Sequence, residues 1–242
     1  MKNLLSRLNP KSLALVQSIG LLARAHGVAA YLVGGPVRDL MLGFPNVDLD
    51  ITVEGNCLRL AEVLASQYRD ARVTRYPAFM TATVHIPDGS QVDFATARQE
   101  IYARGGAFPE VKPSSIKDDL LRRDFTINAM AIAINPDTWG KLIDPFGGLS
   151  DLLSKRLRVL HEKSFLDDPT RILRAARLKA RLGLSVEAKT LKLLKSAIKI
   201  KVLDTIKPQR YLKDFNKILK EPKSREAIKC LKEWSAYRFP RE

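Results

Sequence analysis

The 242-residue sequence is poor in the residues that mark several protein classes. It has two cysteines, Cys57 and Cys230, far apart and without paired-ligand spacing, and three scattered histidines, which argues against a His/Cys zinc site. No apolar run approaches the roughly 18 residues of a membrane span, and the N-terminal stretch MKNLLSRLNP lacks a signal-peptide pattern. These absences predict a cytoplasmic protein with reduced thiols.

Acidic residues are scarce in only one half of the chain. Residues 1–150 carry 16 Lys/Arg and 15 Asp/Glu, whereas residues 151–242 carry 25 and 11. The net charges are therefore +1 and +14, out of +15 for the whole chain. This asymmetry predicts a polyanionic partner for the second half, with nucleic acid as the first candidate. The alternative is a helical bundle whose lysines simply face water.

Hydrophobic periodicity divides the chain into an α+β part and a helical part. A helix is expected from Asn9-Pro10 to Gly27, and others over residues 57–68 and 115–124. Strands are expected at 29–33, 47–53, 72–76, 81–86 and 90–96, with a hairpin formed by 128–134 and 140–144. Residues 97–115 are predicted to form a long loop. From residue 149 the pattern is wholly helical, and the clearest helix, over 167–183, ends at Gly183.

Two carboxylates lie two residues apart in the segment VDLDI, residues 47–51. In a strand, Val47, Leu49 and Ile51 would line one face, and Asp48 and Asp50 would share the other. Like charges at close range are unfavourable unless a cation lies between them. A divalent metal site and a solvated sheet face both fit this pattern.

The segment GGPVRD, residues 34–39, lies between a predicted strand and a short helix. Gly34 and Gly35 allow a sharp turn with exposed N–H groups, and the helix N-terminus adds partial positive charge, so a phosphate could bind there. Arg38 would add charge on the same ligand. A simple glycine turn is the alternative, because the segment is neither a G-x-G-x-x-G motif nor a Walker loop.

Several segments in this order carry a family resemblance. They are LVGGPVRDLMLGFPNVDLDITV, RRDFTINAMAI (122–132), IDPFGGLSDL (143–152) and DDPTRILRAARLKARLG (167–183). The chain resembles the class II tRNA nucleotidyltransferase and bacterial poly(A) polymerase family of the polymerase β superfamily. The resemblance implies a mixed-sheet nucleotidyltransferase head over residues 1–148, followed by a basic helical neck and partial body over 149–242.

The resemblance also favours the metal interpretation of the aspartate pair. Nucleotidyl transfer uses two Mg²⁺ ions held by shared carboxylates, which assigns Asp48 and Asp50 as catalytic metal ligands. Asp93, on a neighbouring predicted strand, is a possible third carboxylate. In RRDFTINAM, the resemblance places Arg123, Asp124 and Asn128 beside the phosphates and sugar of the nucleotide. A charged helix end is the alternative for the arginines.

The segment DDPTRILRAAR is expected to select the base. Asp168 and Arg171, three residues apart, would share a helical face, with Arg174 and Arg177 continuing that row. Arg174 and Arg177 would complete the nucleotide site by holding phosphates or stiffening the template. A carboxylate accepts from an amine and a guanidinium donates to a ring nitrogen, which suits cytosine and adenine but not uracil or guanine. The family pattern is Glu-Asp-x-x-Arg, and this chain has Asp167 at the first position. An i,i+3 salt bridge without a ligand is the alternative.

The expected activity is addition of A, or CCA, to the 3′ acceptor end of tRNA, with ATP and CTP as substrates. The loop over 97–115 is not shortened, which argues against an enzyme that adds only CC. Poly(A) tailing is one alternative, although the Arg-Arg-Phe-x-x-x-His signature of typical bacterial poly(A) polymerases is missing. The other alternative is a non-catalytic RNA-binding protein built on an inactive head.

Overall fold

The computed structural model describes residues 4–45, 48–101 and 110–238, which form two compact units. The first unit contains the described residues up to 149, except 101, 110 and 124–126. Those five cluster with residues 150–238 in the second unit. Among the described residues, no helix is long and apolar enough to cross a membrane.

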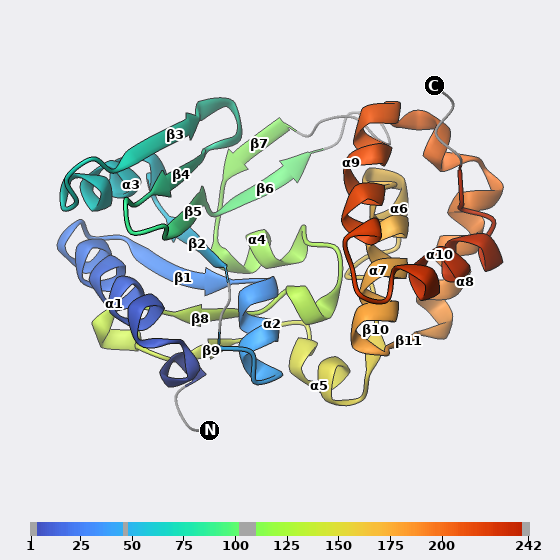
Figure 1. The fold of residues 1–242 in the computed structure, drawn as a ribbon, viewed down its shortest axis with the longest axis horizontal. Helices are drawn as coiled ribbons and strands as arrows, with labels where there is room; N and C mark the ends of the chain where they lie inside the picture. The colour runs from blue at the N-terminus through green and yellow to red at the C-terminus, as the bar shows by residue number, and fades with distance from the viewer. Residues whose placement is uncertain (1–3, 46–47, 102–109, 239–242) are drawn as a thin grey trace. The chain divides into compact units, whose positions relative to one another are not determined.

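A seven-stranded mixed sheet is the centre of the first unit (Figure 1). Its strand order is β3-β4-β5-β2-β1-β8-β9, and β2 and β5 are its parallel pair. The strands are β1 (Ala29–Val33), β2 (Leu49–Glu54), β3 (Arg72–Tyr76), β4 (Thr81–His85), β5 (Gln91–Thr96), β8 (Ala131–Ala133) and β9 (Leu142–Ile143). This confirms the predicted α+β class, the five early strands and the hairpin between residues 128 and 144.

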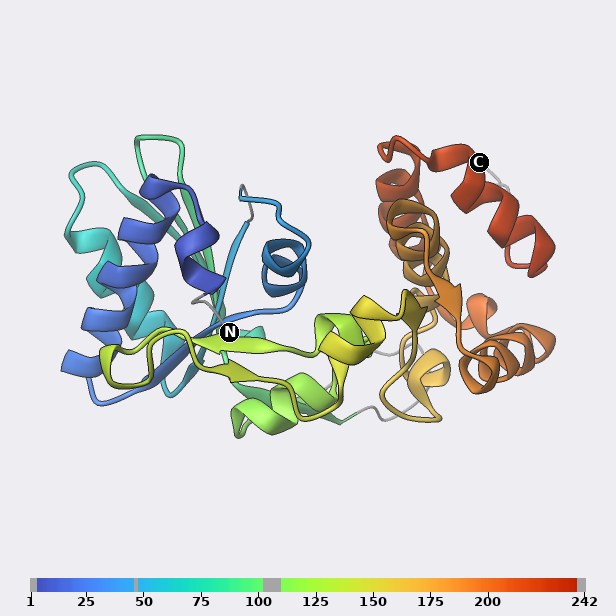
Figure 2. The same ribbon diagram turned by 90° about the horizontal axis from the view of Figure 1, so that it is seen from below.

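Figure 2 shows α1 (Pro10–Ala25) and α3 (Cys57–Ser66) on one face of this sheet, and α2 (Gly35–Met41) on the other. Helix α1 begins as predicted, because the Asn9 side chain accepts a hydrogen bond from the Ser12 N–H at 2.8 Å. The shorter elements of this unit are η1 (Leu4–Arg7), η2 (Pro77–Phe79), α4 (Ile116–Leu121) and η4 (Pro136–Thr138). The short helix η3 (Thr126–Asn128) has its first residue in the second unit.

The long loop predicted over residues 97–115 is wrong at both ends. Residues 98–101 form β6 (Arg98–Ile101) and residues 110–113 form β7 (Glu110–Pro113), and the two make a separate two-stranded sheet. The middle of the predicted loop lies outside the described residues. The glycines and prolines of the segment gave a loop signal that hid these short strands.

The second unit is mainly helical but not wholly so. It contains β10 (Arg156–Leu157) and β11 (Ser185–Val186), which pair in parallel and correct the all-helical prediction. Two-residue strands are too short to leave an alternating pattern in the sequence. Its helices are α6 (Ser164–Asp167), α7 (Arg171–Leu182), α8 (Ala188–Lys199), η5 (Val202–Thr205), α9 (Pro208–Leu219) and α10 (Ser224–Glu233), preceded by α5 (Gly148–Leu153) at the unit boundary.

Helix α7 is central to the second unit. It packs against both α10 and α9, and its residues Ile172, Leu173 and Ala176 are fully buried. Gly183 ends the helix as predicted, in the left-handed conformation with φ of 64°. The start differs, because the helix begins at Arg171 and not at 167.

Candidate active site

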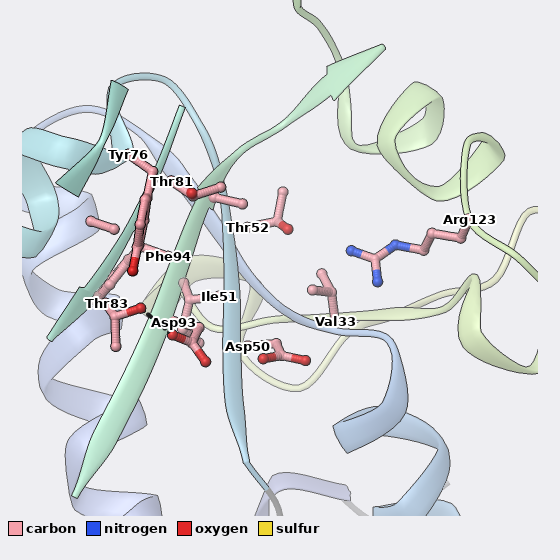
Figure 3. A pocket seen from close by; sticks show the side chains of 12 residues that line it. Val33, Asp50, Ile51, Thr52, Tyr76, Thr81, Thr83, Asp93, Phe94 and Arg123 are labelled. Carbon is pink, nitrogen blue, oxygen red and sulfur yellow. Dashed lines mark hydrogen bonds between the residues drawn. The ribbon is translucent and has the colours of Figure 1, made fainter. Parts of the chain in front are cut away.

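A pocket of about 270 Å³ lies on the sheet of the first unit, with carboxylates from two adjacent strands in its wall. Asp50 on β2 is directly opposite Asp93 on the parallel strand β5. Figure 3 shows these two side chains next to each other, with the Arg123 guanidinium directed toward them from one side and Tyr76 on the other. The structure therefore brings two of the predicted carboxylates and the predicted arginine to one cavity.

Strand alternation explains how β2 presents Asp50. Leu49, Ile51 and Val53 are buried on one side, and Asp50 and Thr52 alternate to the other. The strand begins one residue after Asp48, which is exposed, and Val47 lies outside the described residues. Asp48 nevertheless acts electrostatically on Asp50.

Asp50 is held in an unfavourable electrostatic environment. The pKa of its carboxyl is raised to about 6, chiefly by burial; Arg123 opposes this rise, and the neighbouring Asp93 and Asp48 add to it. A cation close to these carboxylates would relieve both the desolvation and the repulsion. The pocket is therefore electrostatically suited to a positively charged ligand.

Asp93 is already engaged by neighbouring side chains. The Thr83 hydroxyl donates to its Oδ1 at 2.6 Å, and the Gln91 amide donates to its Oδ2 at 3.1 Å. Among the described residues, no group of three or more Asp, Glu, His or Cys side chains forms a ready metal cage. A metal ion here would accordingly need ligands from a bound molecule or from water as well as from the protein.

Gly34 and Arg123 lie in contact beside this pocket. Gly34 is the N-cap of α2 with φ of 76°, and a Cβ added there would lie 2.5 Å from Arg123 Nη1. Only glycine combines that backbone conformation with room for the guanidinium. The buried Nε of Arg123 has no hydrogen-bond partner among the described residues. The Gly34 N–H itself donates to the Met130 carbonyl oxygen.

Arg38 lies apart from the pocket wall and is only 5% exposed. Its Nε and Nη2 donate to the carboxylate of Asp39, at 2.8 and 3.0 Å, and its Nη1 donates to Asn128 Oδ1 at 2.5 Å. Arg38 and Asn128, both predicted to bind nucleotide, are thus linked to each other. Gly35 begins α2 beside the Arg38 guanidinium.

The predicted residues of the second unit do not form one row on a single helix. Asp124 and Arg174 form an ion pair at 3.2 Å, and Arg177 pairs with Glu221 at 3.5 Å. Asp168 is not on α7, which corrects the prediction of a shared helical face with Arg171. It follows α6 with extended backbone angles, φ −131° and ψ 94°, because the residue before Pro169 avoids the helical region.

Arg171 is almost fully buried in the second unit. Its Nη1 donates to the Ser164 hydroxyl at 2.6 Å and lies 3.5 Å from His161 Nε2. Burial lowers the pKa of the His161 imidazole, and the Arg171 charge lowers it further. The neutral imidazole can therefore sit beside the guanidinium without repulsion.

Residues 30–158, more than half of the chain, match the sequence profile of the poly(A) polymerase head domain. The chain belongs to the poly(A) polymerase head domain family. An A-adding tRNA nucleotidyltransferase from Aquifex aeolicus is 46% identical over 206 residues, which are 85% of this chain and 25% of that protein. The chain thus spans about a quarter of this curated relative.

Solved structures with the same fold cover the chain almost completely. A CCA-adding enzyme in an apo form has a TM-score of 0.90 and 42% identity, covering 97% of this chain and 55% of its own. A tRNA nucleotidyltransferase complexed with a primer tRNA and an incoming ATP analogue has a TM-score of 0.80 and 42% identity. The match covers 91% of this chain and 60% of that one. The mixed sheet with appended helices is therefore the nucleotidyltransferase fold predicted from the sequence.

One buried residue of this head domain was missed by the sequence interpretation. Asp119 on α4 is 0% exposed, and its carboxylate pairs with Arg123 at 2.9 Å and with Arg122 at 2.7 Å. Burial alone would raise the pKa of Asp119, but Arg123 and Arg122 hold it below its ordinary value. Asp119 therefore anchors the arginine that faces the pocket. The i,i+3 and i,i+4 spacing in DDLLRR was the available signal.

Proposed function

We propose that this chain transfers a nucleotide from ATP, or from CTP and ATP, to the 3′ end of tRNA without a nucleic-acid template. The observation that carries the proposal is the pocket with Asp50 and Asp93 on adjacent strands and Arg123 at its edge. The arrangement can neutralise a triphosphate next to paired carboxylates. Such an activity would place the protein in the cytoplasm.

The carboxylates of Asp48 and Asp50 would hold two Mg²⁺ ions, with Asp93 as a weaker candidate ligand. Oxygen ligands suit this metal, and the missing positions of its coordination sphere are of the kind that substrate phosphates fill. Bound Mg²⁺ would activate the attacking 3′-hydroxyl and neutralise the pyrophosphate leaving group. Asp50 is half-buried and its pKa is raised to about 6, so the protein itself does not satisfy this charge.

Arg123 would bind the triphosphate from the Gly34 side of the pocket. Its guanidinium is fixed by Asp119 at one nitrogen, and its buried Nε has no partner among the described residues. A planar guanidinium that is held at one nitrogen can donate its other N–H groups to phosphate oxygens. Asp124 and Asn128 are proposed to contact the ribose hydroxyls, with Arg174 holding Asp124.

Asp168 and Arg171 would select the base. The carboxylate of Asp168 accepts from the exocyclic amine of adenine or cytosine, and Arg171 donates to the adjacent ring nitrogen. Uracil and guanine present the opposite pattern at these edges and would leave buried groups unpaired, which disfavours them. Arg177 is paired with Glu221 and would stiffen this region rather than contact the nucleotide.

An extension assay tests the proposal directly. The protein is incubated with labelled ATP or CTP and tRNA ending before CCA, after C, or after CC. We expect one A on the CC-ended tRNA for an A-adding enzyme, and three additions to the shortest tRNA for a CCA-adding enzyme. A long ladder would show tailing, and tRNA binding without any incorporation would show an inactive head.

Gly34→Ala should lower the rate of nucleotide transfer by at least 100-fold. The new Cβ displaces the Arg123 guanidinium, and misplacing a phosphate-binding group costs transition-state stabilisation. Gly43→Ala is the matched control, because Gly43 also has positive φ, at 88°, but an added Cβ meets nothing within 4 Å. Comparable rates for the two variants, measured with the CC-ended tRNA, would contradict the role of Arg123.

Binding of tRNA should weaken steeply with salt, and α8 should carry part of that dependence. Lys192, Lys195 and Lys199 are exposed and follow one another at helical spacing. Replacing all three with Gln should reduce the magnitude of the slope of the logarithm of the tRNA association constant against the logarithm of salt concentration by about 2 to 3, because each lysine would lose one phosphate contact. Filter binding across a salt series measures this. The control replaces three exposed arginines of the head, Arg59, Arg69 and Arg72, and an equal change there would refute the assignment.

A further inference from the structure

The carboxylate of Asp168 is fixed through one of its two oxygens. Its Oδ1 accepts from the Thr170 N–H at 3.0 Å, from the Thr170 hydroxyl at 2.7 Å and from Arg210 Nη2 at 3.0 Å. The described residues place no hydrogen-bond donor on Oδ2. The side chain is 15% exposed, so it remains reachable by a ligand.

Arg210 comes from a distant part of the sequence. It lies in the first turn of α9, 42 residues after Asp168, and its side chain is 24% exposed. A charge-assisted bond from a guanidinium is stronger than a neutral one and directional. Together with the local Thr170 bonds it therefore fixes the rotation of the Asp168 carboxylate, with Oδ1 saturated and Oδ2 presented.

A carboxylate with one available oxygen discriminates between bases differently from one with two. Adenine and cytosine each offer an exocyclic amine, which needs a single acceptor. Guanine offers two adjacent donors, N1–H and N2–H₂, which a freely rotating carboxylate can accept with both oxygens. Occupation of Oδ1 removes that second bond, so guanine would lose its best arrangement while adenine and cytosine would not.

We propose that Arg210 is a positioning residue for base selection, which excludes guanine by holding Oδ1 of Asp168. The inference rests on the proposed role of Asp168 as the base-reading carboxylate. Arg210 acts through Asp168 and does not itself contact the nucleotide. Its loss therefore changes the preference among nucleotides more than the rate with the correct one.

The test compares Arg210→Gln with Lys213→Gln. Lys213 is exposed one helical turn further along α9, so both variants lose one positive charge from the same helix. The readout is the ratio of kcat/KM for ATP to that for GTP on CC-ended tRNA, together with the ratio of the two Kd values from calorimetry. We expect Arg210→Gln to lower both ratios about tenfold, as the loss of one charge-assisted bond would. Lys213→Gln should leave them unchanged, and Arg210→Lys should restore part of the preference.

The outcomes separate this inference from the proposed function. If the wild-type chain binds neither nucleotide, the proposed function is wrong and the inference falls with it. If Asp168→Asn abolishes discrimination but a folded Arg210→Gln keeps it, the function stands and the role of Arg210 alone is refuted. If Arg210→Gln does not fold, Arg210→Lys is measured in its place, and an ATP-to-GTP ratio equal to that of the wild type in that variant overturns the inference.

Discussion

Replacing Asp50 with asparagine should abolish nucleotide transfer and, at the same time, stabilise the metal-free protein. The carboxyl has a pKa of about 6 in the folded chain, above its value of about 4 in an unfolded one. The folded state therefore binds the proton more tightly, and wild-type stability should fall as the pH rises from about 4 to about 6. Above that range the buried charge costs roughly 2–3 kcal/mol, which asparagine does not incur.

Thermal melts at pH 5 and pH 7.5, with and without Mg²⁺, measure this effect. Asp50→Asn should melt higher than the wild type at pH 7.5 without metal, and added Mg²⁺ should stabilise the wild type but not the variant. Asp137→Asn removes an exposed carboxylate and serves as the control. A variant that turns over normally, or that responds to Mg²⁺ as the wild type does, would rule out Asp50 as a metal ligand. Binding of tRNA should be largely unchanged.

Replacing Asp119 with asparagine should have the opposite effect on stability and also weaken nucleotide binding. The variant leaves Arg122 and Arg123 without their shared, fully buried counter-charge, and breaking such a network costs about 3 kcal/mol. Arg123 also loses its anchor, so the KM for ATP should rise. Urea unfolding and steady-state kinetics at saturating tRNA measure the two effects.

Asp118→Asn is the matched control on the same helix. Asp118 lies next to Asp119 but accepts hydrogen bonds from the Ser114 and Ser115 hydroxyls at the exposed helix start, so its loss should destabilise the fold much less than the loss of Asp119. The effect of Asp119 should also depend on pH. Its folded pKa is depressed, so its stabilisation is present above about pH 4 and is lost as the pH falls through the folded pKa. Wild type and Asp119→Asn should converge in acid, and a gap that stays constant would contradict the ion-pair explanation.

Local signals in the sequence predicted the elements that are formed by local forces. The Asn9-Pro10 cap, the left-handed Gly183 and the alternation around Asp50 each depend on a few neighbouring residues. The same kind of pattern drew attention to Asp48 and Asp50, but their assignment as metal ligands came from the family resemblance and stays a prediction. The strands β6, β7, β10 and β11 were missed because segments of two to four residues leave no periodicity to detect.

The contacts that hold the site were less accessible to sequence reasoning. Asp168 was placed on a helix although Pro169 follows it, and the conformational restriction before proline was the overlooked signal. Asp119 had a readable i,i+4 relation to Arg123. The hydrogen bond between Arg210 and Asp168 had no signal in the sequence, because 42 residues separate the two and only tertiary packing brings them together.

The chain crosses between its two units repeatedly, and this has a consequence for recombination. Residues 124–126 belong to the helical unit, where Asp124 meets Arg174, Phe125 bridges to Val159 and Thr126 donates to Asp151. A hybrid that exchanges residues 150–242 between relatives would inherit these partners from two parents. A hybrid that takes residues 124–126 from the same parent as residues 150–242 keeps these contacts matched and should fold. A hybrid with a single junction near residue 149 pairs side chains from two parents and should be less stable.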